Sequence, residues 1–463
     1  MKSKIILIQI IIFALLTGCN NLQSSKKSQE TGKSKKAPES FVKHPQWSKN
    51  ANIYEVNIRQ YTKEGTFKAF EKHLPRLKKM DVDILWIMPI FPISEKNRKG
   101  TLGSYYAVSN YEAVNPEFGT MDDLKELVKR AHKMGFKVIL DWVANHTGWD
   151  NAWINDHPDW YTKDSTGHIV SPFDWTDVAD LNYNNKELWE AMTGALEFWI
   201  EEADVDGFRC DVAGMVPTEF WNQARAKLNN IKPVFMLAEA EQPDLQIYAF
   251  DMTYAWELHH ILNQIAKGKQ NANSIESYFE KQDTTFPADA YRMNFITNHD
   301  ENSWNGTVKE RMGEGGQAFA VLTFTLPGMP LIYSGQEVGL DKRLKFFEKD
   351  EIEWNLSSPL IDFYTKLNKL KTGNKALWNG KYGGKMTRIK ASDDKSVFAF
   401  VREKEGNRIF TLVNLSGTTV TFTLQGDNFA GKYTELFSGT DATFIPGAEI
   451  TLDAWGYKIY SGL

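Results

Sequence analysis

Hydrophobic positions follow two alternating patterns along most of this chain. Short apolar runs, such as residues 84–89 (ILWIMP), are continuous, which is typical of strands buried on both faces of a parallel sheet. Between these runs, apolar residues recur at helical spacing, as in residues 124–131, after which Gly135 provides a C-cap. The pattern predicts strands at residues 53–58, 84–89, 138–141, 207–211, 234–237, 250–252, 293–297 and 331–333.

Eight strands that alternate with helices predict a (β/α)8 TIM barrel over residues 45–378, with an open doubly wound sheet as the alternative. Polar residues follow several of the strands directly, which favours the barrel. Residues 147–185 separate the third strand from its helix, and a connection of this length predicts a short inserted subdomain. From residue 379 to 463, short alternating strands with turn residues predict a C-terminal antiparallel β-sandwich domain.

The N-terminus has the pattern of a targeting segment. Lys2 and Lys4 precede an apolar run over residues 5–16 that is too short to span a bilayer comfortably. The run ends in Leu-Thr-Gly-Cys19, which resembles a bacterial lipobox. We therefore predict a lipoprotein signal peptide over residues 1–19, and an ordinary secretory signal is the alternative.

A lipid on Cys19 anchors the protein to a membrane of the bacterial cell envelope, at the periplasmic face or the cell surface, if the lipobox prediction holds. Residues 20–44 are rich in Ser, Lys and Gln and are predicted to be a flexible tether. The remaining cysteine, Cys210, is predicted to be a small buried residue of a strand, so we expect no internal disulfide.

Composition narrows the possible partners. The chain carries a net charge of −5, and no basic stripe stands out in the folded region, so we expect no nucleic-acid partner. The chain is rich in aromatic residues, with 15 Trp and 17 Tyr. Most of them are expected to pack in the core, but aromatic rings beside polar loops are also typical of sugar-binding clefts.

Four polar segments each follow a predicted strand, and barrel topology brings the ends of those strands to one face. The segments are Asp141-Trp-Val-Ala-Asn145-His146, Gly207-Phe-Arg209-Cys-Asp211, Leu237-Ala-Glu239 and Asn298-His299-Asp300. Each segment alone has a structural explanation, such as a salt bridge or a polar turn. Together they indicate one active site, and paired carboxyl groups are what glycosidic bond cleavage requires.

Two of these segments suggest roles for their carboxylates. Arg209 and Asp211 are two residues apart on a strand, so their side chains share a face. A guanidinium beside a carboxylate favours the charged form, which a nucleophile needs. Glu239 leaves an apolar strand and is therefore expected to be partly desolvated, which suits a general acid.

The four segments resemble the signature regions of the α-amylase family, glycoside hydrolase family 13. Residues 178–182 and 103–111 resemble two further motifs of that family. The resemblance implies that Asp211 is the nucleophile, Glu239 the acid/base and Asp300 the carboxylate that stabilises the transition state. The residues that it implies for substrate binding and support are Tyr106, His146, Arg209, His299 and Asp141.

The function that this resemblance implies is retaining hydrolysis of α-glucosidic, mainly α-1,4, bonds in starch-derived glucans or maltooligosaccharides. Cleavage of cyclodextrins or α-1,6 bonds, or transglycosylation, is a close variant. A glucan-binding lipoprotein without chemistry is the alternative from another class. The presence of Asp211, Glu239 and Asp300 favours the enzyme.

The chain also departs from the family pattern. Many α-amylases carry a Lys-His pair three and four residues after the nucleophile, where this chain has Gly214 and Met215. This difference affects contacts on the leaving-group side. Asn145 matches the position of a calcium ligand in many members, so calcium is a candidate cofactor. Candidate partner ligands in the inserted loop are Asp174, Asp177 and Asp180.

Overall fold

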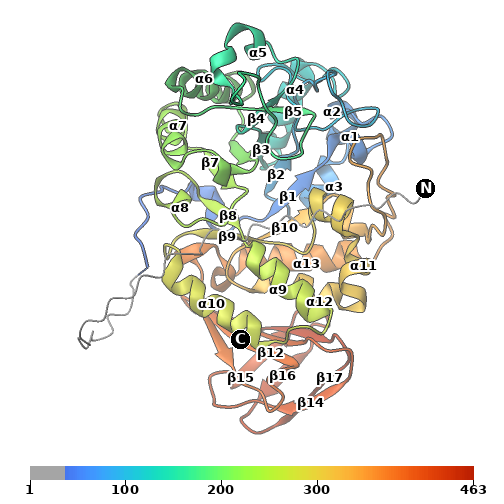
Figure 1. The fold of residues 1–463 in the computed structure, drawn as a ribbon. Helices are drawn as coiled ribbons and strands as arrows, with labels where there is room; N and C mark the ends of the chain where they lie inside the picture. The colour runs from blue at the N-terminus through green and yellow to red at the C-terminus, as the bar shows by residue number, and fades with distance from the viewer. Residues whose placement is uncertain (1–36, 463) are drawn as a thin grey trace, which may run out of the picture. The chain divides into compact units, whose positions relative to one another are not determined.

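The computed structural model describes residues 37–462, and eight parallel strands of this part close into a barrel. In space the strands follow the order β1-β10-β9-β8-β7-β6-β3-β2 (Figure 1). The closed barrel confirms the predicted TIM barrel, and the alternative of an open doubly wound sheet is wrong. The strands are β1 (Ile53–Val56), β2 (Ile84–Ile87), β3 (Lys137–Trp142), β6 (Gly207–Cys210), β7 (Phe235–Ala238), β8 (Met252–Tyr254), β9 (Tyr291–Asn294) and β10 (Met329–Tyr333).

Side chains that alternate along the strands fill the inside of the barrel, while their neighbours pack outward against the helices. Ile84, Trp86 and Phe235 belong to the inner cluster, whereas Leu85 and Ile87 belong to the outer core. The longer helices are α4 (Met121–Lys133), α6 (Lys186–Ala203), α7 (Thr218–Ile231), α9 (Trp256–Ala266), α10 (Asn273–Thr285), α12 (Gly316–Thr325) and α13 (Leu360–Gly373). The shorter ones are α1 (Ile58–Tyr61), α2 (Phe67–Glu71), α3 (Leu74–Lys79), α5 (Trp153–Asp156), α8 (Leu245–Tyr248) and α11 (Val308–Met312).

Local chemistry explains where the observed elements differ from the predicted ones. Phe67, Phe70, Leu74 and Leu77 recur at the spacing of one helix, but the structure divides them between α2 and α3. Pro75 lies in the first turn of α3, where its missing N–H leaves no hydrogen bond unmade. The first strand ends at Val56 because Asn57 caps α1 by accepting a hydrogen bond from the Gln60 backbone. The strand predicted at residues 293–297 is β9, which ends three residues earlier.

The inserted loop contains a small antiparallel pair, β4 (His146–Gly148) with β5 (Val178–Asp180), so the connection after β3 has structure of its own. The C-terminal region forms a six-stranded antiparallel sheet and a two-stranded one around a shared core, as predicted for this domain. Its strands are β11 (Met386–Ile389), β12 (Val397–Lys404), β13 (Asn407–Asn414), β14 (Val420–Thr423), β15 (Gly431–Glu435), β16 (Asp441–Phe444), β17 (Glu449–Leu452) and β18 (Tyr457–Gly462).

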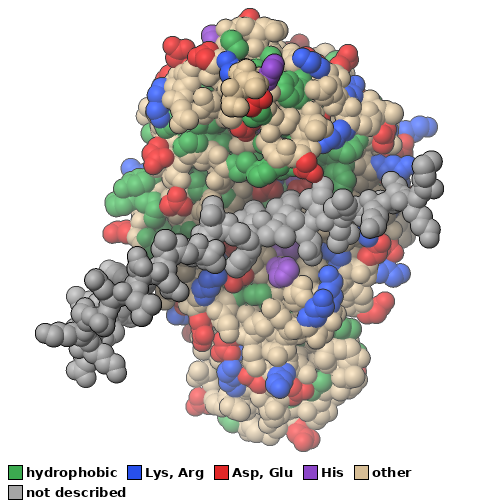
Figure 2. All heavy atoms as spheres, in the orientation of Figure 1, with side chains coloured by type: hydrophobic (Ala, Val, Ile, Leu, Met, Phe, Trp, Pro, Cys, Tyr) green, Lys and Arg blue, Asp and Glu red, His purple; other side chains and the backbone are tan. Residues whose placement is uncertain are grey.

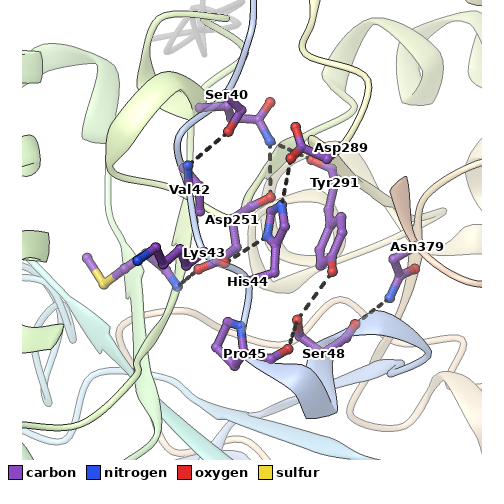
Figure 3. A network of polar contacts seen from close by, with 12 residues as sticks. Ser40, Val42, Lys43, His44, Pro45, Ser48, Asp251, Asp289, Tyr291 and Asn379 are labelled. Atoms are coloured by element: carbon purple, nitrogen blue, oxygen red, sulfur yellow. Dashed lines mark hydrogen bonds and ion pairs between the residues drawn. The ribbon is translucent and has the colours of Figure 1, made fainter. Parts of the chain in front are cut away.

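The segment before β1 is held at the amino-terminal end of the barrel strands (Figure 3). His44 Nδ1 lies 2.8 Å from Asp251 Oδ1, and the imidazole stacks on the Tyr291 ring with centroids 4.3 Å apart. The Phe41 backbone N–H donates to the Ile247 carbonyl at 2.8 Å. Residues 40–44, which the sequence assigns to a flexible tether, therefore contact the barrel, because Val42 and His44 provide groups that can be buried.

The predicted signal peptide, its Cys19 and residues 20–36 lie outside the described residues, so the lipid anchor stays a prediction. Within residues 37–462, no helix has the length and apolar character needed to cross a membrane. On the face shown in Figure 2, acidic and basic side chains are interspersed, in agreement with the lack of a basic stripe in the sequence.

Candidate active site

The predicted site residues meet at the carboxyl ends of the barrel strands, around the buried guanidinium of Arg209. Its Nη1 lies 2.8 Å from Asp141 Oδ1 and 3.1 Å from Asp211 Oδ1. Its Nη2 lies 2.9 Å from Glu239 Oε2, in an ion-pair contact that is not aligned as a hydrogen bond. The strands β3, β6 and β7 thus each place one carboxylate beside the Arg209 guanidinium.

The ionisation of Asp211 differs from the simple expectation for an Arg–Asp pair. Burial, followed by the neighbouring Glu239 carboxylate, raises the pKa of Asp211 well above its usual value, although Arg209 acts in the opposite direction. One guanidinium shared by three carboxylates cannot offset their burial and mutual repulsion. The site therefore stores electrostatic free energy, as catalytic sites with closely spaced acids do.

The backbone next to Asp211 positions Glu239. The Val212 N–H donates to Glu239 Oε2 at 2.8 Å. Val212 has φ +36° and ψ 43°, in the left-handed region that a β-branched residue rarely adopts. This unusual conformation comes directly after Asp211 and directs the N–H at the second carboxylate. The placement of Asp211 and that of Glu239 are therefore coupled through one peptide unit.

Tyr106 connects the third strand to the residues after β9. Its hydroxyl donates to Asp141 Oδ2 at 3.1 Å and lies 2.8 Å from His299 Nε2. The Tyr106 ring stacks on the His299 imidazole, with ring centroids 5.6 Å apart. Asp300 Oδ2 lies 3.3 Å from the same His299 nitrogen. These contacts bring the side chains of Tyr106, His299 and Asp300 together beside Asp141.

The two histidines of the site differ in charge. Burial disfavours a charged His299, but Asp300 and Glu55 together raise the pKa of its imidazole to about 9. Burial lowers the pKa of His146 to about 4, and Asp177 opposes this shift only in part. At neutral pH His299 is therefore an imidazolium that donates from both ring nitrogens, whereas His146 is neutral.

Sequence reasoning missed three residues that support this arrangement. Glu55 of β1 is fully buried, and its Oε1 lies 2.5 Å from His299 Nδ1. Trp86 of β2 donates its indole N–H to Asp141 Oδ2 at 3.1 Å, and the Tyr254 hydroxyl of β8 accepts a hydrogen bond from Arg209 Nε at 3.2 Å. The signal for Glu55 is the carboxylate inside the apolar strand IYEV, since a buried acid needs a partner.

The pKa of His299 predicts a pH dependence of stability. Because the folded-state pKa of about 9 lies above the unfolded value near 6.5, the charged imidazole stabilises the fold below pH 6.5, and this contribution is lost as the pH rises through 9. Relative to His299→Gln, the wild type is expected to lose on the order of 3 kcal/mol of unfolding free energy between pH 6 and pH 10.

Urea unfolding of both proteins at several pH values measures this difference. His146→Gln is the matched control, because the pKa of His146 is lowered to about 4 and the side chain is neutral above pH 7 in the folded and unfolded chain alike. Between about pH 7.5 and pH 10, its unfolding free energy is expected to run parallel to that of the wild type. Parallel curves for His299→Gln as well would contradict the charged state assigned to His299.

The acidic side chains that are candidates for binding calcium do not gather into one cluster in the described residues. Among the described residues, no group of three or more His, Cys, Asp or Glu side chains is arranged to hold an ion. Asp177 is buried and pairs instead with Lys99, with Oδ1 and Nζ 2.8 Å apart. The Asn145 side-chain nitrogen lies 3.3 Å from His146 Nδ1, and Asp174 is exposed on the loop. These side chains therefore do not by themselves supply the oxygen ligands that calcium takes, and calcium binding at Asn145 stays a prediction.

Comparison with known proteins agrees with this geometry. The family model for the alpha amylase catalytic domain matches residues 33–177 and 155–369, and that for the maltogenic amylase C-terminal domain matches residues 386–459. Alpha-amylase MalA from Haloarcula japonica is 26% identical over 423 residues, which cover 86% of this chain and 61% of that relative. Alpha-amylase 3 from Dictyoglomus thermophilum is 27% identical, with 82% of this chain and 88% of the relative covered.

Two solved structures are similar over nearly their whole length. The maltogenic alpha-amylase AmyB from Thermotoga neapolitana has a TM-score of 0.82 and 30% identity, with 89% of this chain and 99% of that chain covered. The alpha-amylase from Lactobacillus plantarum has a TM-score of 0.80 and 30% identity, with 90% and 100% covered. With its barrel, its arginine-centred carboxylates and its C-terminal sheet domain, the chain belongs to the α-amylase family of glycoside hydrolases, family 13.

Proposed function

We propose that this protein is a retaining glycoside hydrolase that cleaves α-glucosidic, mainly α-1,4, bonds of starch-derived glucans or maltooligosaccharides. The observation that carries the proposal is the contact of Asp211 and Glu239 with the same Arg209 guanidinium, which holds the two carboxyl groups close to each other. Such closely spaced pairs are typical of enzymes that retain anomeric configuration. Relatives named alpha-amylase, maltogenic alpha-amylase and cyclomaltodextrinase support an α-glucan substrate.

In the first step, an Asp211 oxygen bonds to the anomeric carbon while the glycosidic C–O bond breaks and Glu239 gives its proton to the leaving oxygen. Glu239 Oε2 accepts the Val212 N–H and faces Arg209, which leaves Oε1 to carry that proton. In the second step, Glu239 takes a proton from water, the water oxygen bonds to the anomeric carbon, and Asp211 leaves. Asp300 and His299 hold the hydroxyls of the reacting sugar.

The leaving-group side lacks the cationic pair found in many α-amylases. A Cβ at Gly214 would lie 2.3 Å from Gln242 Oε1, so Gln242 occupies the space beside that position. Met215 is 42% exposed. An amide and a thioether therefore replace Lys and His, and neither attracts a sugar hydroxyl as strongly as a charge does. We infer a tolerant acceptor side that admits curved substrates such as cyclodextrins.

Product analysis on four substrates tests this function. The protein, incubated with maltoheptaose, amylose, pullulan and β-cyclodextrin, is expected to release maltooligosaccharides from the first two. Cleavage of β-cyclodextrin at a comparable rate would support the tolerant acceptor side, and cleavage of pullulan at its α-1,6 bonds would change the proposed bond preference. No product from any of the four would contradict the proposed function.

We propose further that catalysis and folding do not depend on calcium, because Lys99 supplies the positive charge beside the buried Asp177. A chelator such as EDTA is therefore expected to leave both the melting temperature and the rate of maltoheptaose hydrolysis unchanged. The variant Lys99→Met is expected to lower the melting temperature, since it leaves a buried carboxylate unpaired. A melting temperature that falls in EDTA and recovers with added Ca²⁺ would contradict this proposal.

A further inference from the structure

A row of aromatic rings leads from the reacting sugar's position to the surface. Tyr106, at 8% exposure, lies parallel to Phe346, with ring centroids 6.2 Å apart and an interplanar angle of 11°. Phe346 is half-buried and contacts Trp304, whose centroid is 5.3 Å away. Trp304 is 52% exposed, so its ring faces solvent at the outer end of the row. We call Phe346 and Trp304 the aromatic shelf.

Trp304 does not owe its position to the core. It lies four residues after Asp300, in the π-helical turn η4 (Glu301–Asn305). π-Helical turns are rare and occur frequently at functional sites. The buried Glu301 anchors this turn, because its Oε2 lies 3.1 Å from His259 Nε2 and 3.6 Å from Arg311 Nη1. Buried polar contacts therefore hold this turn in place, while its largest apolar side chain remains exposed to solvent.

Phe346 and Trp304 of the aromatic shelf lie on two different loops, and hydrogen bonds join these loops. The Asn302 amide donates to the Lys342 carbonyl at 3.0 Å, and its Oδ1 accepts the Leu344 N–H at 2.9 Å. The Thr307 hydroxyl donates to Asp341 Oδ1 at 2.6 Å. These bonds fix the loop after β10, which carries Phe346, against the turn after β9. A preorganised surface binds a ligand without a further cost of ordering its own side chains.

The position of the shelf identifies the side of the substrate that it faces. Glu239, which protonates the leaving group, follows β7, and Met215 lies after β6. The shelf lies after β9 and β10, so the row runs away from the leaving-group side. A glucan that enters the site therefore places the units on the non-reducing side of the cleaved bond along this row. The apolar face of a glucosyl ring is the chemistry that an exposed indole recognises.

We propose that Trp304 and Phe346 form a binding subsite for a glucosyl unit on the non-reducing side of the cleaved bond, and that Trp304 sets the preference for longer chains. The inference rests on the proposed function, because it assumes that an α-glucan occupies the catalytic pocket. Trp304 binds substrate away from the reacting atoms, so its loss is expected to affect substrate binding and cleavage position and to spare the chemical step.

The test compares Trp304→Ala and Trp304→Phe with the wild type on maltotriose to maltoheptaose. For Trp304→Ala, kcat/KM on maltoheptaose is expected to fall about tenfold, through KM, while kcat/KM on maltotriose changes much less. With maltoheptaose labelled at its reducing end, cleavage is expected to move toward the non-reducing end, which gives longer labelled products. Trp304→Phe retains a ring and is expected to restore most of the wild-type pattern.

Tyr248→Ala is the matched control, because Tyr248 is also 52% exposed but belongs to α8, before β8, at the opposite end of the barrel strands. Its kinetics are expected to equal those of the wild type. An unchanged cleavage pattern in Trp304→Ala, while the wild type hydrolyses maltoheptaose, would overturn the subsite and leave the proposed function standing. A wild type that hydrolyses none of these substrates would instead overturn the proposed function.

Discussion

Asp211→Asn is expected to lower kcat on maltoheptaose by roughly four orders of magnitude or more, which is the scale seen when a catalytic nucleophile is removed. The amide cannot form the covalent glycosyl-enzyme, although it keeps the size and shape of the carboxylate. Glu239, Asp300 and the sugar-binding residues remain, so substrate binding is expected to persist. Initial rates, together with maltoheptaose binding measured by calorimetry, separate these two effects.

The same substitution is expected to stabilise the fold. Burial and Glu239 raise the pKa of Asp211 above its unfolded value, so at neutral pH the ionised carboxylate disfavours the folded state. Asp211→Asn removes this charge, and the melting temperature is expected to rise. Asp427→Asn, on an exposed loop of the C-terminal domain, is the control and is expected to change neither property. An inactive variant with a lowered melting temperature would point to misfolding instead of a lost nucleophile.

Arg209→Lys is expected to destabilise the protein by about 3 kcal/mol or more and to abolish most of its activity. A lysine provides one compact charge and cannot contact Asp141, Asp211 and Glu239 together, as the forked guanidinium does. Buried carboxylates then remain without a counter-charge. Because Arg209 opposes the upward pKa shift of Asp211, its loss is also expected to move the acid limb of the pH–activity profile to higher pH.

Arg343→Lys is the matched control for this prediction. Arg343 also pairs with a carboxylate, with Nε 2.8 Å from Glu310 Oε2, but both side chains are about half exposed. Solvent screens a surface pair of this kind, which adds little to stability, so this variant is expected to resemble the wild type. Chemical unfolding and pH–rate profiles of both variants provide the measurement. Equal stability of Arg209→Lys and Arg343→Lys would contradict the central role given to Arg209.

Much of this fold could be predicted because the barrel has a strong local pattern. The buried strands are continuous apolar runs, and the polar residues that follow them fall at one face by topology alone. Asp141, Asp211, Glu239 and Arg209 could therefore be placed together from their positions at the ends of the strands. The apolar spacing from Phe67 to Leu77 predicted one helix and missed the break between α2 and α3, where Pro75 begins a new helical turn.

Features that depend on distant contacts could not be predicted in this way. Glu55 and His299 are 244 residues apart, and only the closed barrel brings β1 beside the residues that follow β9. The pKa of Asp211 is another example, because the Arg209–Asp211 pair alone predicts a charged carboxylate, while burial and Glu239 raise the pKa instead. The left-handed Val212 likewise has no signal in its residue type.

The most direct test of the central claim follows the anomeric configuration of the first product. Proton NMR spectra recorded during the first minutes of maltoheptaose hydrolysis, before mutarotation equilibrates the anomers, distinguish the two outcomes. If Asp211 forms a covalent intermediate and Glu239 then activates water, the new reducing end appears first as the α anomer. Initial accumulation of the β anomer would mean a single inversion and would contradict the assignment of Asp211 as nucleophile.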